Sequence, residues 1–113
     1  NLTWLDLSSN QLTGEIPSEI GSLTNLISLH LNNNQLTGEI PSEIGNLTNL
    51  SWWFNLSHNQ LTGDVPLEFA NLTNLSSLTI SNNYLTGLPE DFGNFTNLFF
   101  LDLGYNLLFY HLQ

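Results

Sequence analysis

The chain repeats one short pattern of apolar and polar positions along its length. In each repeat an apolar residue stands on both sides of a polar one, as in Leu5-Asp6-Leu7 and Leu29-His30-Leu31. Alternation with a period of two is typical of a short strand with one buried face. The equivalent triplets are Phe54-Asn55-Leu56, Leu78-Thr79-Ile80 and Leu101-Asp102-Leu103. The pattern therefore predicts a row of short strands that stack in parallel.

The spacing of this pattern defines the units of an internal repeat. The segment LTGEIPSEIG occurs at residues 12–21 and again at 36–45, displaced by 24 residues. Each unit opens at a leucine that follows an asparagine. The units span residues 2–25, 26–49, 50–74, 75–97 and, in part, 98–113. We therefore expect residues 1–113 to form a single solenoid of about 4.5 units of 23–25 residues, with no evident cap at either end.

Three further residue types recur once per unit after the strand. An asparagine follows at Asn10, Asn34, Asn59, Asn83 and Asn106, and its buried amide is expected to satisfy backbone groups of its own and neighbouring turns. Glycine comes next, at Gly14, Gly38, Gly63 and Gly87, where a tight bend is expected. Proline at Pro17, Pro41, Pro66 and Pro89 predicts the start of a short helical turn.

The period and the strings LTGEIP and LTNL resemble the plant-type extracellular leucine-rich repeat, over the whole chain. The resemblance implies an α/β-type repeat solenoid, with a parallel sheet on the concave face and short helical or 3-10 turns on the convex face. It also implies that ligands are recognised on the concave face. Two departures from the period stand out: an extra residue at Trp52-Trp53, where a bulge is expected, and a missing one at Gly87-Leu88-Pro89.

Composition excludes several functions. All ten charged residues are Asp or Glu, which gives a net charge of −10, and Lys, Arg and Cys are absent. Nucleic-acid binding and Walker-type phosphate binding both need cationic side chains. Thiol catalysis and thiolate metal sites need cysteine. The longest apolar runs, such as residues 98–101, fall far short of the ~20 residues that a membrane-spanning helix needs.

The variable residues beside the strand leucines form a candidate binding strip on the concave face. Exposed aromatic side chains interleaved with small polar ones favour recognition, because Trp and Tyr supply contact area at low entropic cost. A glycan-facing or packing surface is the alternative. The residues of the strip are Trp4, Asp6, His30, Trp52, Trp53, Phe100, Asp102 and Tyr105.

The strip also brings together residue types that occur in catalytic triads. Asp6 and His30 are expected side by side, with Ser28 nearby. Such a site would lie on an open sheet face without a nucleophile elbow, an oxyanion hole or a pocket. We therefore expect no catalytic residue and no enzyme activity. A milder hypothesis is that Asp6 favours the charged form of His30.

The acidic residues occupy two repeat positions, so two rows of like charge are expected on the convex side. Like charges at about 5 Å repel one another in water by roughly 0.8 kcal/mol. A calcium ion bridging such carboxylates is a weak possibility beside the simpler interpretation of solvated faces, and no cofactor or other metal is expected. The rows are Glu15, Glu39 and Asp64, and Glu19, Glu43, Glu68 and Asp91.

Seven Asn-x-Ser/Thr sequons suit a secreted, N-glycosylated chain, located extracellularly or at the cell wall or surface. Some of them arise because the repeat string NLTNL contains a sequon. A sugar at Asn55 would obstruct the concave face. The acceptors are Asn1, Asn46, Asn49, Asn55, Asn71, Asn74 and Asn94.

Three functions remain open, and all of them work by surface contact. The first is a structural fibre, in which the apolar end of one chain, Leu107, Leu108, Phe109 and Tyr110, packs head to tail on the next chain. The second is recognition of a protein or peptide by a segment of a receptor-like or inhibitor-like ectodomain. The third is ice binding by threonine rows at Thr13, Thr37, Thr62 and Thr86 and at Thr24, Thr48, Thr73 and Thr96. The sequence slightly favours the first.

Overall fold

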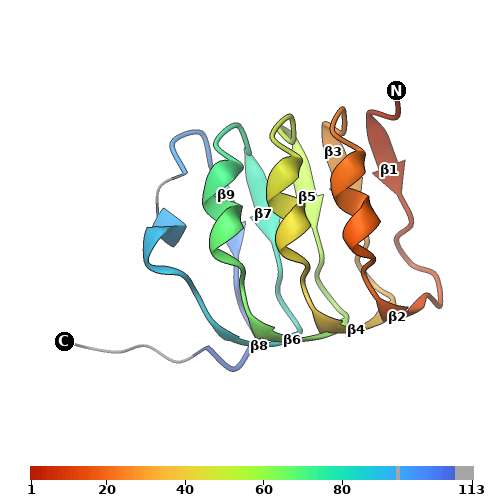
Figure 1. Ribbon diagram of the computed structural model, residues 1–113. Coiled ribbons are helices and arrows are strands. Elements are labelled where there is room, and N and C mark those ends of the chain that lie inside the picture. The colour runs from red at the N-terminus through yellow and green to blue at the C-terminus, as the bar shows by residue number, and fades with distance from the viewer. Residues whose placement is uncertain (94, 109–113) are drawn as a thin grey trace.

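The computed structural model of the chain describes residues 1–93 and 95–108 (Figure 1). Within these residues the chain winds into a stack of similar coils, and each of the first four coils contains two short strands and a 3-10 turn. One parallel sheet contains β1 (Trp4–Asp6), β3 (Ser28–His30), β5 (Trp53–Asn55), β7 (Ser77–Thr79) and β9 (Phe100–Asp102). A second contains β2 (Thr13–Glu15), β4 (Gln35–Glu39), β6 (Gln60–Asp64) and β8 (Tyr84–Gly87). The turns are η1 (Ser18–Ser22), η2 (Ser42–Asn46), η3 (Leu67–Asn71) and η4 (Glu90–Gly93).

The first sheet confirms the predicted strands and their parallel stacking. Its order is β1-β3-β5-β7-β9, so each coil pairs with the next along the sequence. The middle residue of each inner strand is fully buried, as Leu29, Phe54 and Leu78 show. Figure 1 shows the 3-10 turns in front of this sheet, on the opposite side of each coil. The predicted solenoid architecture is therefore confirmed.

The second sheet was not predicted, and it changes the interpretation of the repeat glycines. Gly14, Gly38 and Gly63 lie within short strands and have φ values of 80°, 75° and 77°. The expected tight bend at these glycines is therefore wrong. A Cβ built on Gly38 would lie 2.6 Å from Cγ of Glu15. Glycine is needed there for two reasons, its left-handed backbone and the acidic side chain of the preceding coil that packs over it.

The prolines stand where helical turns were predicted to begin. Pro17, Pro41 and Pro66 directly precede η1, η2 and η3, in extended conformation. η1 and η2 approach so closely that a Cβ on Gly21 would lie 2.7 Å from the carbonyl oxygen of Glu43. No helix in the described part of the chain is long and apolar enough to cross a membrane.

The strand pairing is interrupted where the bulge was expected, at Trp52-Trp53: Ser28 pairs with Trp4 and Trp53 pairs with Ser77, but Ser28 and Trp53 are not paired with each other. The pairing of β3 with β5 runs without a shift from Leu29↔Phe54 to His30↔Asn55. The extra residue precedes this stretch, where the N–H groups of Ser51 and Trp52 both donate to the carbonyl of Ile27 at 3.1 and 3.2 Å. A register shift occurs between Gly63 and Asp64, opposite the coil that lacks a residue before its proline.

In the inner coils the recurring position after the strand holds a buried asparagine that joins adjacent coils, as predicted: Asn34, Asn59 and Asn83 are buried, whereas Asn106 is half-buried and Asn10 is exposed. Nδ2 of Asn59 donates to the carbonyl of Leu56 in its own coil at 3.1 Å and to that of Leu31 in the preceding coil at 3.0 Å. Its Oδ1 accepts from the backbone N–H of Leu36, also in the preceding coil, at 3.1 Å. Asn34, Asn83 and Asn106 make the equivalent bonds. We call these four residues the asparagine ladder.

Replacing Asn59 by alanine should destabilise the chain by about 2 to 4 kcal/mol, because buried backbone groups of two coils lose their partner at once. Asn10 makes only bonds within its own exposed coil, so Asn10→Ala is the matched control, with an expected loss below about 1 kcal/mol. Urea unfolding followed by circular dichroism measures both. Equal losses would show that the bridge between coils contributes nothing beyond a local turn.

Candidate binding surface on the concave sheet

Strand pairing places the predicted strip in two registered rows. Asp6 lies opposite His30, His30 opposite Asn55, Asn55 opposite Thr79, and Thr79 opposite Asp102. In a second row Trp4 lies opposite Ser28, Trp53 lies opposite Ser77, and Ser77 lies opposite Phe100. The carboxylates therefore stand at the two ends of the first row, with uncharged polar side chains or His30 between them.

Three aromatic rings of the strip form one cluster. The rings of Trp4 and His30 are stacked, with centroids 5.6 Å apart. Trp53 meets the other side of His30 edge to face, at 5.8 Å. Both tryptophans remain half exposed, whereas His30 is buried between them. The cluster holds Trp4 and Trp53 in fixed positions with their outer faces in solvent.

Two hollows border this cluster. One has a volume of about 540 Å³ and is mainly apolar. The other, about 420 Å³, lies over the strand row and shares Trp53 and Phe99 with the first. The first is lined by Trp4, Ser51, Trp52, Trp53, Ser76 and Phe99. The second is lined by Ser8, His30, Asn32, Trp53, Asn55, Ser77, Thr79, Phe99 and Phe100.

The lining of the hollows includes Phe99, which was not predicted, and it lacks Tyr105, which was. Phe99 lines both hollows and is 81% exposed. Its signal in the sequence is an aromatic residue directly after the unit-opening Leu98, outside the alternating triplet. Tyr105, 84% exposed in the turn after β9, lines neither hollow. Trp52, 66% exposed, lines the first.

The polar groups of the strip are engaged in bonds that differ from a catalytic triad. Oδ1 of Asp6 accepts from the hydroxyl of Ser8 at 2.6 Å and from its backbone N–H at 2.9 Å. These two bonds lower the pKa of Asp6, and the nearby His30 adds a smaller effect in the same direction. Nε2 of His30 lies 2.9 Å from Oγ of Ser28, which donates to the carbonyl of Trp53 at 3.3 Å. Asp6 therefore bonds to Ser8 and not to His30, and the donor in the bond between His30 and Ser28 is set by the histidine tautomer.

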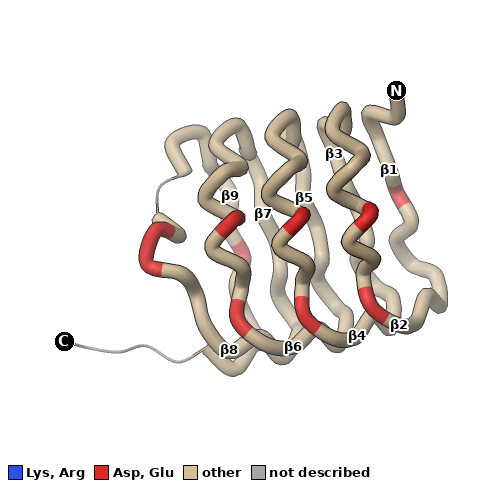
Figure 2. Tube along the Cα trace, viewed as in Figure 1, with Lys and Arg blue, Asp and Glu red and all other residues tan. Residues whose placement is uncertain are grey.

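The acidic rows are less regular than the repeat suggests. Figure 2 shows red positions recurring from coil to coil, with no basic residue to accompany them. In the second sheet, however, Glu15 lies opposite Thr37 and Glu39 opposite Thr62. Asp64 accepts a hydrogen bond from the hydroxyl of Thr86 at 2.7 Å. Glu15 and Glu39 thus stand opposite threonines and not opposite each other. Likewise the residues Thr13, Thr37, Thr62 and Thr86 do not stand opposite one another, since Thr13 faces Gln35 and Thr37 faces Glu15 and Gln60.

The calcium possibility finds no support in this arrangement. Among the described residues, no group of three or more His, Cys, Asp and Glu side chains is placed to hold a metal ion. Glu19, Glu43 and Glu68 lie one on each successive 3-10 turn, each at its N-terminal end. Asp91 is exposed in η4.

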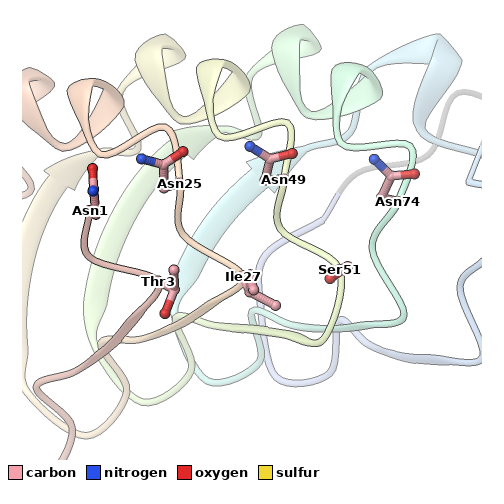
Figure 3. A pocket seen from close by; sticks show the side chains of 7 residues that line it. All are labelled: Asn1, Thr3, Asn25, Ile27, Asn49, Ser51 and Asn74. Carbon is pink, nitrogen blue, oxygen red and sulfur yellow. The ribbon is translucent and has the colours of Figure 1, made fainter.

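A regular polar edge runs beside the first sheet. Nδ2 of Asn49 donates to the carbonyl of Thr24 in the preceding coil at 2.8 Å, and Asn74 donates likewise to Thr48 at 3.1 Å. Asn97 repeats the bond to Thr73 at 3.1 Å. Figure 3 shows Asn1, Asn25, Asn49 and Asn74 in line along this edge, around a shallow hollow of about 760 Å³ that also includes Thr3, Ile27 and Ser51. The row Thr24, Thr48, Thr73 and Thr96 is exposed beside it.

The sequons differ in how free their acceptor amides are. Asn46 and Asn71 are exposed at the C-terminal ends of η2 and η3, and Asn1 is exposed as well. Asn49 and Asn74 are exposed but use their amide nitrogen in the bonds just described. Oδ1 of the half-buried Asn55 accepts from Ser57. Asn94 lies outside the described residues.

The predicted assembly end is described only in part. Leu107 is 53% exposed, and Leu108 is half-buried against the core. Phe109 and Tyr110 lie outside the described residues.

Comparison with known proteins identifies the repeats. Residues 1–38 match the family model "Leucine Rich repeats (2 copies)", and residues 53–108 match the model "Leucine rich repeat". A search of curated proteins gave no match.

Solved structures with the same coil geometry come from plant proteins. The plant peptide hormone receptor RGFR1, in complex with RGF2, is 41% identical, with a TM-score of 0.92 over 95% of this chain and 17% of that one. A plant ice-binding protein is 46% identical, with a TM-score of 0.85 over 95% and 34%. The BIR2 ectodomain from Arabidopsis thaliana is 35% identical, with a TM-score of 0.80 over 94% and 56%. The chain thus spans less than two thirds of each of them. On its repeats, its family models and these likenesses, the chain belongs to the plant-type leucine-rich repeat family.

Proposed function

We propose that this chain is a non-catalytic extracellular binding scaffold whose concave sheet recognises a protein or peptide. The observation that carries the proposal is the aromatic cluster of Trp4, His30 and Trp53 beside two hollows that share Trp53 and Phe99 in their linings. Rigid, half-exposed aromatic side chains next to a concavity are typical of the central contacts of an interface. Small polar residues around them, such as Ser77 and Thr79, supply hydrogen bonds without bulk.

The similar structures support a peptide or protein as the ligand. RGFR1 was solved with the peptide hormone RGF2, and the receptor kinase HAESA, 37% identical, with the peptide hormone IDA and a co-receptor. Both are receptors, and the BIR2 structure is an ectodomain, which supports an extracellular location for this chain. An extended segment of a partner fits a face whose contacts lie along several coils.

Association of chains end to end, with N-glycans on the convex side, is a second candidate. The first coil exposes positions that inner coils bury: Leu7 is 39% exposed, whereas the equivalent Leu31 is 5% exposed. At the other end Leu101 and Leu107 are exposed. A second copy, or further coils, would cover these apolar faces. The exposed sequons at Asn46 and Asn71 lie away from both ends, so sugars there leave the contact free.

Ice binding is a third candidate, favoured by one observation besides the 46% identity to a plant ice-binding protein. The row Thr24, Thr48, Thr73 and Thr96 stands beside asparagines that bond from coil to coil, so its spacing is fixed by the backbone. The row carries no charge. The other threonine row, in which Thr37 stands opposite Glu15 and Thr62 opposite Glu39, lacks this regularity.

Loss of Trp53 should weaken ligand binding. Dodecapeptides selected from a random phage library on the 113-residue chain supply the ligands, and calorimetry measures their Kd. Trp53→Ala should raise Kd by at least about tenfold, because the residue borders both hollows. Leu67→Ala removes a side chain that is 68% exposed on the convex side and should change nothing. If no selected peptide depends on Trp53, the concave face is not the binding site.

The chain secreted from a eukaryotic host should carry N-glycans and associate. Intact mass before and after enzymatic deglycosylation reports the glycans, and sedimentation velocity at micromolar concentration reports the association. We expect Leu7→Glu to reduce association, because it places a charge in the apolar end face. Thr62→Glu, on an exposed face of an inner coil, is the control. A chain that stays monomeric would rule out end-to-end assembly.

Ice binding should appear as thermal hysteresis that depends on one threonine row. Thr48→Tyr places a bulky ring in the regular row and should abolish the effect, whereas Thr37→Tyr, in the irregular row, should leave it intact. Ice crystals that grow unmodified in the presence of the unaltered chain would dispose of this candidate.

A further inference from the structure

The concave face carries two carboxylates and no fixed positive charge. Asp6 and Asp102 occupy the two ends of the registered row through His30, Asn55 and Thr79. The chain has no Lys or Arg at all, and its net charge is −10. A ligand on this face therefore meets a negative potential, with a carboxylate at each end of the binding strip.

Each of these carboxylates is oriented by the strand end that carries it. Oδ1 of Asp6 accepts from Ser8, and Oδ1 of Asp102 accepts from the backbone N–H of Gly104 at 3.0 Å. The same loop geometry at the two ends leaves the second oxygen of each carboxylate for an outside donor. Both side chains are reachable, since Asp6 is exposed and Asp102 is half-buried.

The surface between the two carboxylates is lined by aromatic rings and hydrogen-bond acceptors. Trp53, Phe99 and Phe100 border the hollow over the row, and they offer ring faces to apolar or cationic side chains. Within the described part of the chain, the buried Oδ1 of Asn32, which belongs to the same hollow, has no hydrogen-bond partner. The strip thus offers acceptors and ring faces, and the complementary ligand supplies N–H donors.

We propose that the ligand of the concave face is an extended cationic peptide with two basic residues that reach Asp6 and Asp102. This inference rests on the proposed recognition function and specifies its partner. Four steps between neighbouring strands separate the two carboxylates, which corresponds to about 19 Å at ~4.8 Å per step. An extended peptide rises ~3.3 Å per residue and its side chains alternate between two faces, so two basic residues that reach the same surface stand about six positions apart. Apolar residues between them face the aromatic rings.

The peptides selected from the random dodecapeptide library test this specificity directly. Their sequences should be enriched in pairs of Lys or Arg about six positions apart. Asp6→Asn and Asp102→Asn should each raise Kd by up to about fivefold, as expected for exposed ion pairs, and added salt should act in the same direction. The double variant Glu19→Gln/Glu43→Gln removes two charges from the convex side, one more than either single variant, and should still leave Kd within about twofold of the unaltered chain.

Two results separate the failure of this proposal from that of the recognition function. Peptides that lose affinity with Trp53→Ala, but carry no paired basic residues or bind Asp6→Asn/Asp102→Asn as well as the unaltered chain, overturn the cationic ligand alone. Peptides that bind independently of Trp53 overturn the recognition function and the cationic ligand with it.

Discussion

The fold depends on backbone groups that no single coil can satisfy by itself. The asparagine ladder meets this need: the side chain of Asn59 accepts from one backbone N–H and donates to carbonyls in two coils. Because the amide is buried, a coil displaced by one residue would leave several polar groups without partners. The advance from coil to coil is thereby fixed. Side chains at equivalent exposed positions of the repeat therefore line up in rows across the coils, and these rows form the surface that other molecules can contact.

The two irregular coils show where this constraint is strict and where it is not. The extra residue at Trp52 lies ahead of the paired stretch of β5, so Phe54 still fills its buried position. It adds an exposed tryptophan at no cost to the core. The coil with one residue fewer, near Leu88, is shortened next to β8 of the second sheet. There the pairing of β6 with β8 shifts register between Gly63 and Asp64. Variation in the loop before the concave strand can thus alter the binding face while the stack stays intact.

The sequence predicted those features that depend on buried, periodic residues. The triplets around Leu29 and Leu78 defined the first sheet, and the recurrence of asparagine predicted the bonds between coils. The second sheet was missed because its strand residues, Thr-Gly-Glu in the first coil, include Gly and Glu, which are poor strand formers and pair here because neighbouring coils supply partners. Its offset pairing, Glu15 with Thr37, has no counterpart in the repeat period. Phe99 was missed because exposure, and not periodicity, makes it part of the site.

Because the chain has no basic residues, salt has opposite effects on the stability of the fold and on the proposed binding of a ligand by the concave face. Repulsion among the convex acids is reduced because the register places Glu15 and Glu39 opposite threonines and not opposite each other, and the remaining repulsion is screened by salt. Salt therefore stabilises the solenoid. The same screening weakens attraction between Asp6 or Asp102 and a cationic ligand. Added salt should therefore weaken ligand binding by the concave face while it stabilises the folded chain. A face that binds through apolar contacts alone would behave differently, because salts such as sulfate strengthen the burial of apolar surface and so increase its affinity. If the concave face binds the cationic peptide proposed above, the charge pattern of this chain selects its partner as well as setting its net charge.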